Sequence, residues 1–271
     1  MSSSENSEKS SPILDNPQHI QKVVQEGLLL GGGAAAILLQ VAMPGVGKGV
    51  DNHSNFSYRP LDRLRTTMTF VYCMAFGTND EKRAVVDMVH RAHAPVKGAD
   101  YDANDTRLQV WVAATLYAVG TDMYEQVFGA MDECAAERLY REYAILAVSL
   151  RVRPEEWPES RAKFWEYWDE QVESMEVTEN AKNVANDLLF NYKLPLHLRV
   201  LMPWIRLVTA ELLPPRIREA YGLKTTKVRR GAYRVTVGFA RATYPCLPMF
   251  VRTYPKRYYM KDMRRRLQKT G

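Results

Sequence analysis

Apolar side chains recur every three or four residues along most of this 271-residue chain, which is the period of an amphipathic helix. In residues 59–76, for example, Leu61, Leu64 and Met68 share one helical face. Prolines punctuate the later segments, and no convincing run of alternating strand residues interrupts the pattern. We therefore predict an all-α fold, a single-domain multi-helix bundle. The expected helices cover about 17–42, 59–76, 80–93, 106–119, 121–129, 132–151, 158–175, 178–191, 196–211, 214–221 and 228–243.

One stretch, residues 27–47, carries no charged side chain and is long enough to cross a bilayer. It also contains six glycines, Gln40 and Pro44, which are poor components of a membrane span. A buried helix from Pro17 to Ala42, in which glycines allow another element to pack closely, explains the composition better.

Composition is that of an ordinary globular protein, with 46% hydrophobic and 25% charged residues. The three cysteines, Cys73, Cys134 and Cys246, are few and far apart, so they indicate neither a disulfide framework nor a thiolate metal site. We expect them to be small buried side chains in a reducing compartment. Residues 1–16, rich in Ser, Glu and Asn, are predicted to be a disordered arm.

The net charge of +6 is unevenly distributed, because residues 224–271 hold 14 Lys/Arg and the single acid Asp262. We predict that residues 246–271 form a basic C-terminal tail. Its tyrosines, Tyr254, Tyr258 and Tyr259, alternate with the cations, which suits a lipid headgroup region. A solvated tail without a partner is an equally good interpretation. No nucleic-acid motif accompanies the charge, so no nucleic-acid partner is expected.

The candidate chemistry centres on two histidines, His90 and His93, the only close pair among five. An imidazole at a helix end among apolar residues suits an axial haem ligand, although a buried structural histidine has the same appearance. Arg63 and Thr67 share a helix face, and together they suit a carboxylate or a haem propionate. A surface arginine is the alternative. Gln40 is the one polar group of an apolar wall.

Five motifs follow one another between about Gly27 and Leu223. They are LLQVAMPGV (38–46), DRLRTT with FGT (62–67 and 76–78), RAHAPVKG (91–98), YDANDTRLQVWVAATL (101–116) and ELLPPRIREAYGL (211–223). In order and spacing they resemble the haem-b oxygenases typified by the fungal MpaB protein and the bacterial latex-clearing (rubber) oxygenases. The resemblance implies that residues 17–245 are a helical catalytic domain with a buried haem pocket.

Carried over residue by residue, the resemblance implies that His93 is the proximal ligand of the iron in haem b, with His90 as the fallback. Arg63 and Thr67 are implied to line the haem pocket and to act in catalysis, and Gln40 to contact the cofactor. The implied activity is that of a haem-dependent oxygenase. It would use O₂ on a lipophilic substrate, isoprenoid or polyketide-derived, in secondary metabolism. The expected location is the cytoplasm or the cytosolic face of the endoplasmic reticulum membrane.

The chain also departs from these relatives. Met43 and Ala113 stand where they commonly have histidine, and no Glu lies between Gln40 and Arg63, where rubber-cleaving members have an acidic base. Asp51 is our candidate substitute base. The departures keep two alternatives open: a catalytically inactive member that binds haem or another apolar ligand, and a membrane-attached scaffold that binds no haem.

Overall fold

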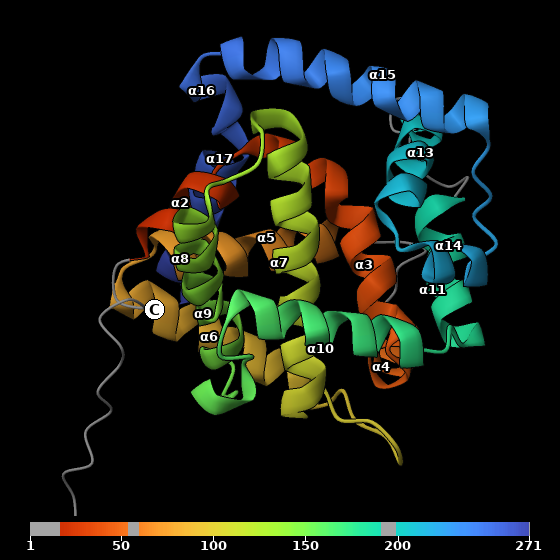
Figure 1. The fold of residues 1–271 in the computed structure, drawn as a ribbon. Coiled ribbons are helices and arrows are strands. Elements are labelled where there is room, and N and C mark those ends of the chain that lie inside the picture. Colours follow the sequence, from red (N-terminus) through yellow and green to blue (C-terminus); the bar gives the residue numbers. More distant parts are fainter. Residues whose placement is uncertain (1–16, 54–59, 191–198, 271) are drawn as a thin grey trace, which may run out of the picture.

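A computed structural model describes residues 17–53, 60–190 and 199–270, and these residues are almost entirely helical (Figure 1). The described part of the chain has one isolated bridge, between Lys97 and Asp102, and no strand, which confirms the predicted all-α class. The predicted arm 1–16 lies outside the described residues. The elements are α2 (Gln18–Val24), η1 (Gly27–Gly32), α3 (Gly33–Ala42), α4 (Pro44–His53), α5 (Pro60–Phe76), α6 (Asn79–His93), α7 (Thr106–Phe128), α8 (Glu133–Tyr143), α9 (Ile145–Val148), η2 (Pro154–Glu156), α10 (Arg161–Ser174), α11 (Glu179–Leu189), α13 (Met202–Leu212), α14 (Pro215–Ala220), α15 (Lys227–Thr243), η3 (Tyr244–Cys246), α16 (Met249–Arg252) and α17 (Tyr254–Thr270).

The centre of the fold is α7, which packs against α3, α8, α9 and α15 (Figure 1). Its buried residues occur on several faces of the helix, as expected for a helix enclosed by neighbours. The side chain of Asp105 caps its first turn by accepting a hydrogen bond from the Arg107 amide at 2.9 Å. The sequence pattern predicts separate helices at 106–119 and 121–129. The structure joins them, because Gly120 and Thr121 continue the helix and Thr121 bonds back to the Tyr117 carbonyl at 2.7 Å.

The N-terminal segment is not the single helix from 17 to 42 that composition predicts. It is broken into α2, η1 and α3, with a 69° bend between α2 and residues 27–42. Gly27 lies at the break, where a Cβ would come within 2.9 Å of the Arg252 carbonyl, so glycine permits the close approach of α16. Among the described residues no single helix is long and apolar enough to span a bilayer. Only this bent pair has the length and the apolar composition of a span. Most of α3 is buried in the core.

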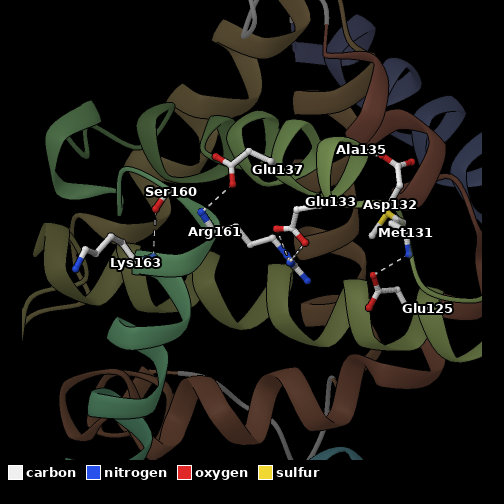
Figure 2. A network of polar contacts seen from close by, with 9 residues as sticks. All are labelled: Glu125, Met131, Asp132, Glu133, Ala135, Glu137, Ser160, Arg161 and Lys163. Atoms are coloured by element: carbon white, nitrogen blue, oxygen red, sulfur yellow. Dashed lines mark hydrogen bonds and ion pairs between the residues drawn. The ribbon is translucent and has the colours of Figure 1, made fainter.

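Polar contacts attach α10 to α8 on one side of α7. The guanidinium of Arg161 donates to Glu133 at 3.1 Å, and the Arg161 amide donates to Glu137 at 3.1 Å (Figure 2). Ser160 caps α10 by accepting from the Lys163 amide at 3.3 Å. These contacts hold the start of α10 against α8. The rings of Tyr117, Tyr140 and Phe164 pack together between α7, α8 and α10.

The basic C-terminal residues form a packed helix instead of an attached tail. α17 lies along α5, and its Met260 and Met263 are buried in the core. Arg65 donates to both carboxylate oxygens of Asp262, at 2.7 and 2.6 Å. Cys73 is buried as predicted, whereas Cys134, in the first turn of α8, and Cys246, at the end of η3, are exposed.

The Asp262 contact predicts how stability depends on pH. Hydrogen bonds from Arg65 lower the pKa of Asp262, so its carboxylate stabilises the fold above the unfolded-chain pKa of about 3.9. That contribution is lost as the pH falls through the lower, folded-state pKa. We expect the melting temperature of Asp262→Asn to fall less steeply than that of the wild type between about pH 5 and pH 2. Thermal unfolding followed by circular dichroism measures this.

The matched control is Asp80→Asn, because Asp80 forms an exposed ion pair with Arg83 and should follow the wild-type curve. Equal slopes for Asp262→Asn and the wild type would contradict the role of the α5–α17 contact.

Candidate functional site

A cavity of about 510 Å³ lies among α4, α5, α6, α7 and the residues around α9. Its volume is in the range of about 300–1,000 Å³ that is typical of small-molecule and cofactor sites. Most of the wall is aliphatic or aromatic, which disfavours water. The polar side chains that line it are Gln40, His53, Arg63, Thr66, Thr67, His93, Tyr101 and Gln109.

The structure brings together four of the five site residues that the sequence indicates. Gln40 from α3, Arg63 and Thr67 from α5, and His93 from α6 all line the cavity. The fifth, Asp51, is not among the lining residues. The fallback ligand His90 does not line the cavity either.

His93 is the last residue of α6, a helix whose start is fixed by a capping box between Thr78 and Glu81. The helix predicted at 80–93 is observed at Asn79–His93. The Nδ1 atom of His93 is buried and has no hydrogen-bond partner among the described residues, so the ring has a nitrogen left for a ligand. Burial lowers the pKa of His93, and the nearby Arg63 charge lowers it further. Both effects favour the neutral imidazole, the form that binds metal.

Arg63 stands one helical turn before Thr67. Its side chain has substantial accessible surface, yet burial lowers the pKa of its guanidinium. The two observations agree if that surface faces the cavity and not the bulk solvent, as its place in the lining indicates. A cation in such surroundings favours a bound anion, and a planar guanidinium matches a carboxylate in particular.

Gln40 is held in a fixed orientation at the cavity wall. Its Nε2 donates to Thr115 Oγ1 at 3.1 Å, and Thr115 in turn donates to the Val112 carbonyl at 2.7 Å. The second N–H of this amide and the side-chain oxygen of Gln40 are left for a ligand.

A polar pair that the sequence reasoning missed lies at the same cavity. His53 Nε2 is 3.1 Å from the Tyr101 hydroxyl, and Asn52 Nδ2 donates to that hydroxyl at 3.2 Å. Because the hydroxyl accepts from Asn52, its own proton is available to His53. The signal that would have found His53 is helical spacing, since Val46, Val50 and His53 share one face of α4 and all line the cavity.

Two glycines position Tyr101. A Cβ on Gly98 would come within 2.5 Å of the Tyr101 ring, and one on Gly49 within 3.5 Å, so the ring lies between two bare backbones. The loop closes on itself through a bond from the Gly98 amide to the Tyr101 carbonyl at 2.8 Å. The RAHAPVKG and YDAND motifs therefore position this tyrosine at the cavity.

Asp51 has a different environment. Its carboxylate accepts hydrogen bonds from Asn180 at 2.7 Å and Asn183 at 3.3 Å, both on α11. These contacts join α4 to α11, and Asp51 is absent from the cavity lining. The geometry therefore gives Asp51 a structural contact and does not place it as a catalytic base.

A helical bundle that encloses an apolar cavity lined by an imidazole and a guanidinium is typical of α-proteins that bind a cofactor or another small ligand. The family described as "ER-bound oxygenase mpaB/B'/Rubber oxygenase, catalytic domain" matches residues 20–242, most of the chain, and the protein belongs to that family. The predicted resemblance is thus confirmed, and the chain carries an oxygenase-type catalytic domain.

Two mycobacterial relatives match nearly end to end. They are the uncharacterized proteins Mb2261 of Mycobacterium bovis and Rv2237 of Mycobacterium tuberculosis. Each is 28% identical over 244 residues, covering 85% of this chain and 94% of the relative. No solved structure matches the chain.

Proposed function

We propose that this protein is a haem-b-dependent oxygenase that uses O₂ to oxidise a lipophilic substrate. The observation that carries the proposal is the convergence of His93, Arg63 and Thr67 on one apolar cavity in a chain of the oxygenase family. The predicted substrate class, isoprenoid or polyketide-derived, agrees with the aliphatic lining. We also propose the cytosol or the cytosolic face of the endoplasmic reticulum membrane as its location.

The residues present fit haem b. His93 would bind the iron through an imidazole nitrogen, and Arg63 with Thr67 would bind a propionate. The described residues contain no cluster of three or more His, Cys, Asp or Glu able to hold a metal ion. In a haem, the porphyrin would supply the other ligands of the iron, so that one imidazole from the protein would suffice. When bound, haem supplies the activation of O₂.

The rest of the chemistry belongs to this chain's own side chains. The aliphatic wall binds an apolar substrate and excludes water. The Tyr101 hydroxyl at the cavity wall holds a proton that it can share with His53 or with an oxygen atom in the cavity. Because His53 is exposed, it can exchange that proton with solvent.

The test is the absorption spectrum of the purified protein after reconstitution with haemin. We expect a Soret band that shifts when carbon monoxide is added to the reduced form. Arg63→Ala should weaken haem binding about tenfold or more, because a hydrogen bond to a charged group contributes about 1.5–3 kcal/mol. The control is Arg91→Ala, since Arg91 is exposed on α6 and does not line the cavity. Absence of a Soret band would refute the haem proposal and favour the scaffold alternative.

A second candidate function is a catalytically inactive member that binds haem or an apolar ligand. The observation that favours it is that no carboxylate is among the cavity-lining residues in the described part of the chain. Oxygen uptake by the reduced, reconstituted protein separates the two functions. Turnover with an isoprenoid alkene supports the oxygenase, whereas stable haem without oxygen uptake across a panel of lipophilic alkenes supports the binding protein.

A further inference from the structure

Most of the exposed large hydrophobic side chains in the described residues lie in one region, from α15 to the start of α17. Three are on α15 (Val228, Val235 and Phe239), and four lie between η3 and the end of α16 (Leu247, Met249, Phe250 and Val251). We call these seven residues the α15–α16 surface. The other two, Tyr254 and Tyr258, are at the start of α17.

α15 has two apolar faces, and only one is used by the fold. The inner face packs on α7, where Tyr233 donates to Gln126 at 2.6 Å. The outer face carries Val228, Val235 and Phe239, which are spaced seven and four residues apart and are 81%, 73% and 70% exposed. Figure 1 shows α15 at the edge of the molecule, across the end of α7, with α16 beyond its C-terminus.

The described part of the chain leaves this outer face uncovered. A Cβ built on Gly231 or Gly238 of α15 meets nothing within 4 Å. Large apolar side chains exposed together in this way mark a surface that binds a partner or a membrane.

Charge indicates the kind of partner. Residues 224–261 contain ten Lys/Arg and no Asp or Glu, and Arg229, Arg234 and Arg241 are exposed on α15. A second copy of this chain, joined through the same surface, would bring these like charges together, which is unfavourable. An anionic partner is favoured.

We propose that the α15–α16 surface docks on an anionic lipid bilayer. Exposed apolar side chains such as Phe239 and Phe250 enter the boundary between headgroups and acyl chains. The exposed arginines of α15 contact lipid phosphates. The membrane contact expected for residues 246–271 is thereby divided between α15 and residues 247–251, and α17 takes little part in it. In α17, Arg264 pairs with Glu81, Arg266 pairs with Asp262, and Met260 and Met263 face the core.

The proposal has a consequence for orientation. The cavity is lined by residues 108–116 of α7, whereas α15 contacts α7 at Gln126, about 15 Å further along the helix axis. A protein docked through α15 would hold its cavity on the side away from the bilayer. The surface would therefore fix the location of the protein and would not form the substrate entrance.

Sedimentation with vesicles of phosphatidylcholine and phosphatidylserine tests the proposal. We expect the full-length protein to bind these vesicles, to bind pure phosphatidylcholine much less, and to be released by salt. Phe239→Glu and Phe250→Glu should each lower the binding constant about tenfold or more, because each replaces an inserted aromatic ring by a charge. Both positions are exposed, so folding is not affected, and circular dichroism checks this.

The matched control is Ser174→Glu, which adds the same charge at an exposed position on α10, well away from α15 in Figure 1. It should bind like the wild type. Equal loss in Ser174→Glu, unchanged binding in both phenylalanine variants, or no vesicle binding by the wild type would each overturn the proposal. So would a wild-type dimer that Phe239→Glu converts to a monomer in light scattering, since the surface would then join two copies. Binding to an acidic polypeptide but not to vesicles would assign the surface to a protein.

Discussion

His93→Ala is expected to weaken haem binding by more than about 100-fold. Mutating a residue that only hydrogen-bonds to a metal ligand already lowers metal affinity about 10- to 100-fold, and the loss of the ligand itself should cost more. His93 is the histidine of α6 that lines the cavity, and its buried Nδ1 has no hydrogen-bond partner among the described residues. His90 lies one helical turn earlier and outside the cavity lining. His90→Ala should therefore keep most of the haem. Titration with haemin, followed at the Soret band, measures both constants.

A variant with room for an added ligand separates ligation from folding. His93→Gly should bind haem poorly alone and recover a Soret band when free imidazole is supplied, because the small molecule can occupy the space of the lost ring. Full haem occupancy in His93→Ala, with native circular dichroism, would show that iron is not bound by this residue. Loss of haem in His90→Ala alone would move the ligand to His90.

The site residues that could be predicted from the sequence are those whose placement is local. Arg63 and Thr67 are four residues apart on α5, and His93 ends a helix whose boundaries follow from caps and periodicity. Their convergence was implied by the family resemblance, and the structure supplies the cavity that brings them together.

The residues that could not be predicted depend on which face of a helix meets which neighbour. Asp51 and His53 lie two residues apart on α4, so they point in different directions. Packing of α4 against α11 turns Asp51 toward Asn180 and leaves His53 at the cavity. The resemblance made Asp51 the candidate, because related enzymes have an acidic base in this region and the sequence does not show in which direction a side chain points.

In the C-terminal region, too, the sequence showed the charge of a segment but not which of its faces packs against the fold. Its high positive charge suggested a tail, whereas Met260 and Met263, three residues apart, mark the stripe that packs α17 into the core. On α15 the helix itself was expected from periodicity, at 228–243 against the observed Lys227–Thr243. The sequence did not predict which face of α15 stays uncovered, because that depends on the contact between its inner face and α7.

The second large effect is expected from Phe164→Ala, which should lower the free energy of unfolding by about 3–5 kcal/mol. Phe164 is fully buried on α10, and its ring centroid lies 4.8 Å from that of Tyr117 on α7 and 5.4 Å from that of Tyr140 on α8. Removing the ring leaves a cavity at the meeting point of three helices, and the surrounding rings can fill it only in part. Urea unfolding measures the loss, and Phe164→Leu, which keeps most of the volume, should lose distinctly less.

Haem links this stability prediction to the ligand prediction. A ligand that binds only the native state raises the free energy of unfolding, by about 2.7 kcal/mol at a concentration one hundred times its dissociation constant. The rings around Phe164 support the cavity half of α7, where Trp111 stacks on Trp168 at 5.2 Å, so excess haemin should restore much of the stability lost in Phe164→Ala. The same addition should not stabilise Phe164→Ala combined with His93→Ala. Equal stabilisation of both proteins by haemin would show that the added haem binds elsewhere, at a site that does not use the imidazole.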